Sequence, residues 1–282
     1  MARPVRLEFK NAVYFISSKS SGRKHIVKDD ADRQTFLDTL EYVVNRYRWK
    51  CHAYCIGNTE YNIAIETPRG NLSVGMRQLN GIYTQKFNRK NKKSGNVFQG
   101  RFKAVVVQKD KYFLDICRHV VTLSQREGIT NNINTFKWSS YRATAGTVDS
   151  PEFLHVDWIH SQFAKRTKNA QDKYRDYIKG AKKADNPLDS VRGQILLGDE
   201  QFIEQMTLML IKGRNKEDVP KWQRHIKRPA LEVIFKGIET KSAKQRNKKV
   251  KEAHGKHGYT LKDIGQYLGL HYTSISRIIN SI

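Results

Sequence analysis

Ten lysine and arginine side chains occur between Glu66 and Asp110, and no acidic residue interrupts them. Cations in this number can neutralise phosphates, and the release of condensed counterions then favours binding to nucleic acid. Aromatic residues lie between the cations, and proteins hold single strands by base stacking combined with phosphate contacts. The interval therefore predicts a nucleic-acid surface, with a solvated charged face and core aromatics as the alternative. The cations are Arg69, Arg77, Lys86, Arg89, Lys90, Lys92, Lys93, Arg101, Lys103 and Lys109, and the aromatics are Tyr83, Phe87, Phe98 and Phe102.

The tail of the chain carries a second group of side chains suited to DNA. Thr260 can cap a helix over 261–268, and Asp263 three residues later completes a capping-box variant that also meets the helix dipole. Gly269 can adopt the left-handed conformation that a sharp turn requires. A second helix is expected over 272–279. The segment predicts a helix-turn-helix.

Apolar positions in this tail fall where a helix-turn-helix core requires them, and the small Gly265 sits where the two helices cross. Short donors and one guanidinium lie outward on the second helix, which suits base edges and phosphates in a major groove. An ordinary helical hairpin with a solvated face is the alternative. The apolar positions are Ile264, Leu268, Leu270, Ile275 and Ile278, and the candidate DNA contacts are His271, Thr273, Ser274 and Arg277.

The charge of the whole chain supports a polyanionic partner. Its 282 residues include 52 Lys+Arg and 27 Asp+Glu, which gives a formal net charge of +25. Nucleic acid is the first candidate partner, and an anionic membrane surface is the second. The apolar runs are far shorter than the roughly 20 residues that cross a bilayer, so no membrane span is expected.

Cysteine usage and the first residues indicate an intracellular protein. The N-terminus contains no continuous apolar stretch of the kind found in secretory signals. Cys51, Cys55 and Cys117 form no CxxC pair and are too few for a disulfide framework, so we interpret them as core residues in a reducing compartment. The expected localisation is cytoplasmic and nucleoid-associated.

Hydrophobic periodicity predicts an α+β domain that positions the basic interval. Strands and helices are expected in the order strand, helix, strand, strand, helix, strand, helix, which is that of a ferredoxin-like sandwich with one appended helix. The expected strands are 11–18, 51–56, 61–66 and 104–107, and the expected helices are 29–49, 71–89 and 110–126.

Beyond about residue 150 the strand signals become sparse and helical patterns take over, as in 172–181 and 201–212. Between Gly213 and Gly258 there are 14 Lys+Arg and 5 Asp+Glu, a difference of +9. We therefore expect three parts: a ferredoxin-fold domain over 1–148, a helical extension over 149–212, and a basic helical segment with the helix-turn-helix over 213–282.

Several short motifs, all in one order, resemble those of the REP-associated tyrosine transposases, which are HUH single-strand transposases. The resemblance is strong over about 1–145, and the tail is similar to the helix-turn-helix of the bacterial replication initiator. The motifs are Ala2-Arg3-Pro4-Val5-Arg6, His52-Ala53-Tyr54-Cys55, Ile65-Glu66-Thr67-Pro68, Gly70-Asn71-Leu72-Ser73, Leu79-Asn80-Gly81-Ile82-Tyr83-Thr84-Gln85, Phe98-Gln99-Gly100-Arg101-Phe102-Lys103, Lys109-Asp110-Lys111-Tyr112 and Trp138-Ser139-Ser140-Tyr141-Arg142.

The resemblance implies a pair of histidines, two residues apart on a strand, that hold a divalent metal. Alternate strand residues point the same way, so both imidazoles can reach one cation that polarises the DNA phosphate. In this chain Glu60-Tyr61-Asn62 stands where that pair is expected. Glu60 could still ligate a hard cation, but Asn62 is a weak ligand.

The family's nucleophile is a tyrosine on the following helix, and this chain has His119 at that position. Leu123 stands where a polar asparagine, a further metal ligand, is expected. Tyr112 lies on the same helix face as His119, but it matches an aromatic that the family already has, and we interpret it and His52 as structural. We therefore assign no catalytic residue and no cofactor, since a divalent metal is expected only if the site is active.

These observations favour a transposase-derived DNA-binding protein that does not cut DNA and acts as a regulator. An active transposase or nickase with an unorthodox site is one alternative, and an RNA-binding or structural protein is another. The expected partners are single-stranded or hairpin DNA for the N-terminal domain and duplex DNA for the tail. The candidate DNA-binding residues are Arg3, Arg77, Lys86, Arg89, Arg101, Lys103, His271, Thr273, Ser274 and Arg277.

Overall fold

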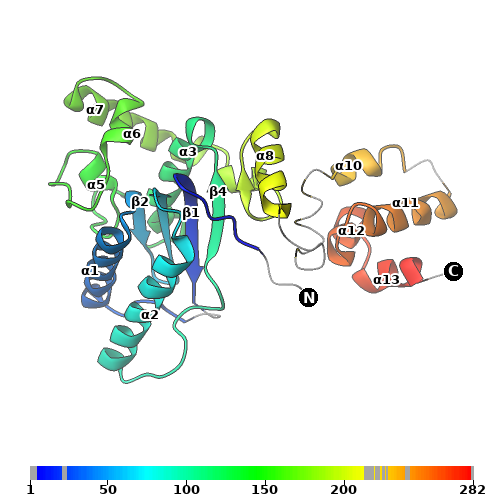
Figure 1. The fold of residues 1–282 in the computed structure, drawn as a ribbon, viewed down its shortest axis with the longest axis horizontal. Helices are drawn as coiled ribbons and strands as arrows, with labels where there is room; N and C mark the ends of the chain where they lie inside the picture. Colours follow the sequence, from blue (N-terminus) through cyan, green and yellow to red (C-terminus); the bar gives the residue numbers. More distant parts are fainter. Residues whose placement is uncertain are drawn as a thin grey trace. The chain divides into compact units, whose positions relative to one another are not determined.

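A computed structural model describes residues 5–20, 24–212, 219, 223, 226, 228–238 and 242–280. The chain forms two compact units (Figure 1). The first, here called the sheet unit, comprises Arg6–Val191 and Ile195–Asp199. The second, the helical unit, comprises Met1–Val5, Arg192–Gln194 and Glu200–Ile282. Residues 149–191 thus belong to the same unit as the sheet.

A five-stranded sheet with the order β2-β3-β1-β4-β5 forms the centre of the sheet unit. The central strand β1 is almost entirely buried and pairs antiparallel with both β3 and β4. Its apolar, β-favouring residues suit this position because both faces of the strand are covered. The strands are β1 (Ala12–Lys19), β2 (Lys50–Ile56), β3 (Glu60–Thr67), β4 (Lys103–Val107) and β5 (Leu196–Leu197).

Helices α1 (Asp30–Tyr47) and α2 (Leu72–Asn91) cover one face of the sheet. Tyr61 of β3 shows this, because its ring lies 4.5 Å from that of Phe36 in α1 and its hydroxyl donates to Asn80 in α2 at 2.6 Å. Asp29 begins α1 by accepting a hydrogen bond from the Asp32 N–H at 2.8 Å.

Helix α3 (Lys109–Val121) lies on the opposite face. Its Phe113 ring contacts His52 of β2 at 5.1 Å, and its His119 ring contacts Phe15 of β1 at 5.6 Å. Since side chains alternate along β3, Glu60 and Asn62 face α3, while Tyr61 between them faces α1 and α2. The predicted mixed α+β architecture is therefore confirmed.

The single helix predicted over 110–126 is wrong, because the chain breaks at Thr122 into α3 and the short α4 (Leu123–Arg126). The Thr122 hydroxyl donates to the carbonyl oxygen of Arg118 at 2.9 Å and to that of His119 at 3.2 Å. Such backward hydrogen bonds compete with the helical pattern and bend helices. The break reorients the residues that follow His119.

Within residues 139–191, the parts of the chain around Ser139 and Leu154 cover the open edge of the sheet at β2. Ser139 and Leu154 form isolated bridges to Cys55 and Cys51, which protects an edge that could otherwise pair with another chain. The helices of this region are α5 (Tyr141–Thr144), α6 (Asp157–Ser161) and α7 (Thr167–Lys179), followed by 3₁₀ turns at Gly180–Lys183 and Pro187–Ser190. The far edge carries β5, which pairs parallel with β4 and which the sequence did not predict.

The helical unit contains a core cluster of Ile234, Phe235, Val250, Ile264 and Ile275 together with Ala253 and Tyr259. The helices between residues 231 and 280 each contribute few apolar residues to it, so these helices depend on one another for burial. The described helices are α8 (Glu200–Ile211), α10 (Leu231–Ile234), α11 (Ala243–Gly255), α12 (Leu261–Leu268) and α13 (Tyr272–Asn280).

All three cysteines are free and fully buried in the sheet unit, as predicted. Burial raises the pKa of the Cys51 and Cys55 thiols to about 12 and the pKa of Cys117 well above its usual value. No helix within the described ranges is long and apolar enough to cross a membrane.

Candidate functional site

Of the two β3 positions where a metal-binding histidine pair is expected, one carries an ion-paired carboxylate and the other a buried amide. The Glu60 carboxylate pairs with the Lys19 ammonium of β1 at 2.9 Å. Asn62 is 1% exposed, and its side-chain oxygen has no hydrogen-bond partner among the described residues. In the part of the chain that is described, no group of three or more His, Cys, Asp or Glu side chains is arranged to hold a metal.

His119 lies on the same face of the sheet as Glu60 and Asn62. Its ring contacts Phe15, and Ser17 two residues further along β1 is the register partner of Asn62. Burial, followed by the neighbouring charges of Arg126 and Lys103, lowers the pKa of His119 to about 3. The imidazole is therefore neutral at physiological pH.

Leu123 begins α4 and is 1% exposed, so it is a core residue. Its neighbour Arg126 donates to the His119 carbonyl oxygen at 2.6 Å and to the Thr122 hydroxyl at 2.8 Å. The structure thus gathers Glu60, Asn62 and His119 on one face of the sheet, but surrounds them with cations and apolar contacts.

Glu127 holds the hairpin turn between β2 and β3, a role that the sequence did not indicate. Its carboxylate accepts hydrogen bonds from the Asn58 N–H at 2.7 Å, the Thr59 N–H at 3.2 Å and the Thr59 hydroxyl at 2.5 Å. Gly57 permits this approach, because a β-carbon there would lie 2.1 Å from a Glu127 carboxylate oxygen. The turn that precedes Glu60 is therefore tied to the end of α4.

A pocket of about 430 Å³ opens beside His119 in the sheet unit. Arg118, His119 and Arg126 line one side, and residues from the segment 181–187 line the other. The Arg118 guanidinium pairs with Asp115 at 2.7 Å and stacks on the Tyr177 ring at 4.3 Å. The pocket thus contains two guanidinium groups and the carboxylates of Asp115 and Asp185, and the Arg118 guanidinium is already paired with Asp115.

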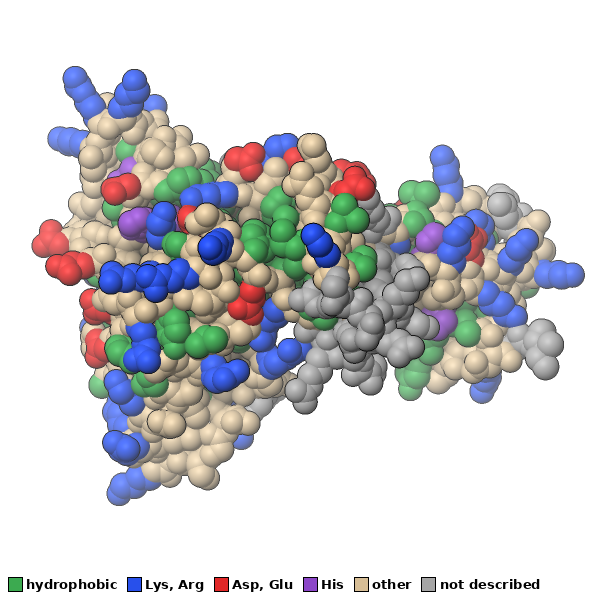
Figure 2. All heavy atoms as spheres, viewed as in Figure 1, with side chains coloured by type: hydrophobic (Ala, Val, Ile, Leu, Met, Phe, Trp, Pro, Cys, Tyr) green, Lys and Arg blue, Asp and Glu red, His purple; other side chains and the backbone are tan. Residues whose placement is uncertain are grey.

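The basic interval forms an exposed surface on α2 and at the start of β4. Arg77, Lys86 and Arg89 on α2 are exposed, and so are Arg101 and Lys103. Figure 2 shows Lys and Arg side chains over α1 and α2 on the face in view. Arg3, which was predicted to belong to the same surface, lies outside the described residues.

Two of the ten cations in the interval are neutralised by acids from elsewhere in the chain. Lys90 pairs with Asp29 at 2.5 Å and Asp32 at 2.9 Å, and Lys109 pairs with Glu66 at 2.5 Å. The prediction of ten unbalanced charges is therefore wrong for these two residues. The predicted base-stacking role is also unavailable to the four interleaved aromatics, because Tyr83, Phe87, Phe98 and Phe102 are all buried.

Glu66 stands in a buried polar cluster beside His52. Its Oε2 lies 3.8 Å from His52 Nε2, which is too far for a hydrogen bond, and 2.5 Å from the Lys109 ammonium. The nearby His52 and the Lys109 ammonium lower the pKa of Glu66 to about 2. His52 is 1% exposed and packs against Phe113, which agrees with its predicted structural role.

The depressed pKa of Glu66 predicts an acid-dependent loss of stability. A carboxyl whose folded pKa is about 2, against 4.5 otherwise, stabilises the fold above pH 4.5 and loses that contribution as the pH falls toward 2. Glu66→Gln is expected to lower the free energy of unfolding by up to about 3 kcal/mol at pH 7 and by far less at pH 2. Urea unfolding of both proteins at several pH values measures this, and an equal difference at pH 7 and pH 2 would contradict it.

In the helical unit, α12 and α13 have the local geometry that the sequence predicted. Thr260 and Asp263 form a reciprocal capping box, and Gly269 ends α12 with a φ of 66°. A β-carbon on Gly265 would lie 2.6 Å from the Leu270 carbonyl oxygen, so this position requires glycine. The two helices consequently pack closely around Ile264 and Ile275, which are both fully buried.

The predicted contact residues of this segment differ in exposure. His271, Thr273 and Arg277 are exposed, whereas Ser274 is half-buried. A His271 ring nitrogen lies 2.8 Å from the Thr273 hydroxyl oxygen, so these two side chains form a hydrogen-bonded pair at the start of α13. Lys244, Lys248 and Lys251 of the adjoining helix α11 are exposed on the same side of that helix.

Comparison with known proteins gives a distant structural likeness. No protein-family model matches the chain, and no curated protein matches it significantly. Among solved structures, the chain is similar to a REP-associated tyrosine transposase bound to a REP hairpin, with a TM-score of 0.47 and 13% sequence identity. The match covers 56% of this chain and 91% of that one. Membership of the family that the sequence motifs resemble stays a prediction.

Proposed function

We propose that this chain is a transposase-derived DNA-binding protein that does not cut DNA. The observation that carries the proposal is the state of the three positions where catalytic groups are expected. Glu60 is paired with Lys19, Asn62 is buried, and His119 is a neutral imidazole beside two cations. These positions supply no histidine pair and no tyrosine nucleophile, whereas exposed cations remain on α2, which covers the other face of the sheet, and at the start of β4.

The strand order supports the predicted ferredoxin-like HUH scaffold. Strands β2-β3-β1-β4 form the antiparallel core, α1 and α2 cover one face, and α3 with His119 covers the other. On this scaffold, Lys86 and Arg89 lie about one turn apart along α2, whereas Arg77, nine residues before Lys86, lies on the opposite side of the helix. We infer that the sheet unit binds single-stranded or hairpin DNA through phosphate contacts of these exposed cations.

The geometry of α12 and α13 supports duplex recognition by the helical unit. The two helices pack closely at Gly265, and Thr273 and Arg277 on α13 remain exposed. A short recognition helix presents its DNA contacts on its exposed side in this way. Arg277 would contact guanine edges or phosphates, and the exposed lysines of α11 would contact phosphates. Recognition of structured or repeated DNA by two separate units suits a regulator.

A binding comparison across nucleic acids tests the proposal. Fluorescence anisotropy with full-length protein would measure affinities for a DNA hairpin with single-stranded flanks, a matched duplex, and an RNA of the same sequence. We expect the hairpin and the duplex to bind at least tenfold more tightly than the RNA. Tighter binding of the RNA would instead favour the RNA-binding alternative.

A substitution at the α12–α13 crossing tests the duplex contribution. Gly265→Ala places a β-carbon 2.6 Å from the Leu270 carbonyl oxygen, so the two helices must separate. We expect duplex affinity to fall at least tenfold while hairpin binding by the sheet unit persists. Gly255→Ala is the matched control, because its β-carbon would meet no atom within 4 Å. Equal duplex affinities of the two variants would refute the assigned role.

A further inference from the structure

The Arg6 guanidinium of the sheet unit is a half-buried cation without an acidic partner. Its central carbon lies 3.6 Å from the centre of the Phe102 ring, and its Nη2 donates to the Phe102 carbonyl oxygen at 2.9 Å. Among the described residues, no acidic side chain forms an ion pair with it. Charges that are withdrawn from water are normally paired, because the loss of hydration is costly. The free protein leaves this charge uncompensated, and a bound anion would compensate it.

A second arginine increases the local excess of positive charge. Arg101 directly precedes Phe102 and is exposed, and burial followed by the Arg101 charge lowers the pKa of Arg6 to about 10. Glu8 opposes this shift, but its carboxylate is bound at the first turn of α2, where it accepts hydrogen bonds from the Ser73 N–H at 3.0 Å and from the Ser73 hydroxyl. Both guanidinium groups are still charged at neutral pH and repel each other, so an anion bound near both would relieve the repulsion.

The segment that carries Arg6 is held on the α2 side of the sheet. The Leu7 carbonyl oxygen accepts a hydrogen bond from the Tyr14 hydroxyl at 2.8 Å, and Glu8 contacts the first turn of α2. Tyr14 lies on this side because Phe15, the next residue of β1, faces α3. Arg6 is therefore positioned by fixed neighbours on the face that also carries the α2 cations, and a guanidinium held in this way loses little side-chain entropy on binding.

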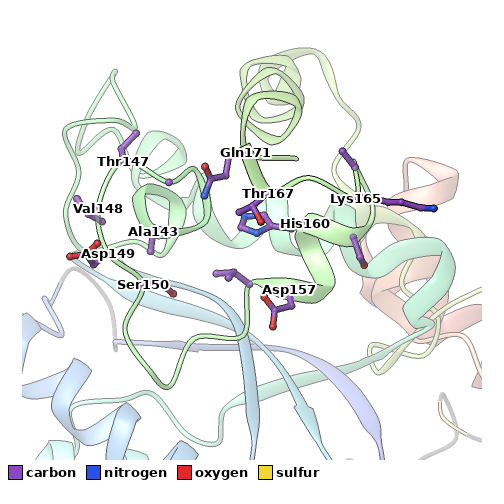
Figure 3. A pocket seen from close by; sticks show the side chains of 14 residues that line it. Ala143, Thr147, Val148, Asp149, Ser150, Asp157, His160, Lys165, Thr167 and Gln171 are labelled. Atoms are coloured by element: carbon purple, nitrogen blue, oxygen red, sulfur yellow. The ribbon is translucent and has the colours of Figure 1, made fainter. Parts of the chain in front are cut away.

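A pocket of about 670 Å³ between α5 and α7 of the sheet unit shows no half-buried charge of this kind. Its buried His160 already lies with Nε2 2.8 Å from the Thr144 carbonyl oxygen. Its charged side chains are exposed, and Figure 3 shows them pointing in different directions: Asp149, Asp157 and Lys165. Water solvates exposed charges, so they require no ligand. The uncompensated charge of Arg6 is the stronger indication of a binding partner.

We propose that Arg6 and Arg101 together bind one phosphate of the DNA backbone and so fix the position of the bound strand on the sheet unit. This inference rests on the proposed DNA binding. The N–H groups of Arg6 that Phe102 does not occupy would donate to two phosphate oxygens, in the bidentate geometry that guanidinium groups form with phosphates. Arg101 would donate to the same phosphate. Arg6 lies outside the basic interval, so the charge pattern of the sequence did not indicate it.

Neutral methylphosphonate linkages, placed one at a time in the backbone of a DNA hairpin with single-stranded flanks, test the proposal. Fluorescence anisotropy measures the affinity of each hairpin for the full-length protein. We expect a linkage at which the replacement weakens binding by the wild-type protein about tenfold, because charge-assisted hydrogen bonds are lost there. In Arg6→Met the same replacement should weaken binding less than about twofold, because the two changes remove one interaction.

The choice of variants separates phosphate recognition from packing and from net charge. Arg6→Met and Arg6→Lys both retain an aliphatic stem that can cover Phe102, so the fold is kept. Arg6→Lys also keeps the charge but lacks the planar fork, and we expect about tenfold weaker hairpin binding with an unchanged salt slope. Lys10→Met is the matched control, since it removes one exposed cation from the same segment and should leave the linkage profile as in the wild type.

The outcomes distinguish this inference from the proposed function. A wild-type linkage profile in Arg6→Met, or wild-type affinity in Arg6→Lys, would overturn the phosphate site while leaving DNA binding intact. If the wild-type protein bound none of the hairpins, the proposed function would fail and this inference with it.

Discussion

The full-length protein is expected to leave a hairpin-bearing DNA strand uncut in the presence of Mg²⁺ or Mn²⁺. Cleavage through a metal-activated phosphate requires ligands that converge on one cation and a nucleophile that can attack. Here Glu60 is paired with Lys19, and Asn62 contributes only a buried amide. The measurement is a nicking assay with end-labelled hairpin substrate, in which product should remain at the level of the protein-free control.

The same assay separates this expectation from the alternative of an unorthodox nickase. A neutral His119 beside Lys103 and Arg126 retains a lone pair, and Tyr112 on the same helix retains a phenol. If either attacked DNA, a covalent protein–DNA adduct would form, and peptide mapping would locate it. Efficient cleavage that disappears in Glu60→Ala or His119→Ala would disprove the proposed loss of chemistry.

Removing the α2 cations is expected to weaken single-strand binding by about 50-fold at ~0.15 M salt. The estimate assumes that Arg77, Lys86 and Arg89 each contact one phosphate. Each contact contributes about −0.7 to the slope of log affinity plotted against log salt concentration. Anisotropy titrations of the triple alanine variant at several salt concentrations measure both the affinity and the slope. The slope should become shallower by about 2.

A charge-matched variant serves as the control for that experiment. Lys165, Arg166 and Lys168 are exposed and lie at the beginning of α7, which is at the opposite end of the sheet unit from α2 (Figure 1). Replacing these three by alanine removes the same net charge. If both triple variants lost affinity equally, the binding would reflect overall charge and the three α2 cations would have no special role.

The elements that depend on local signals were predictable from the sequence. The hairpin of β2 and β3 follows from alternating side chains around a Gly-Asn-Thr turn, and the start of α12 follows from Thr260 and Asp263. Both signals act within a few residues, where side-chain geometry limits the backbone to few conformations. The strand β5 had no such signal, because two residues gain their strand conformation only by pairing with β4.

The sequence pointed to the residues of the candidate site but not to their contacts. Aligned motifs pointed to Glu60, Asn62 and His119, and the structure places all three on the α3 face of the sheet. The contacts of Lys90 with Asp29 and Asp32 join residues about 60 positions apart, so neighbouring charges in the sequence could not reveal them. Burial of the aromatics was likewise ambiguous, because cores and base-stacking surfaces use the same side chains.

The burial of all three cysteines gives this chain a practical property. Cys51, Cys55 and Cys117 are fully buried, and their raised pKa values leave almost no thiolate at neutral pH. We therefore expect these three thiols to react only slowly with maleimide and disulfide reagents in the folded protein. A single cysteine introduced at an exposed position of α2 or α13 would then be a unique attachment point, so each unit can carry a probe or a DNA cross-linker without removal of the native thiols.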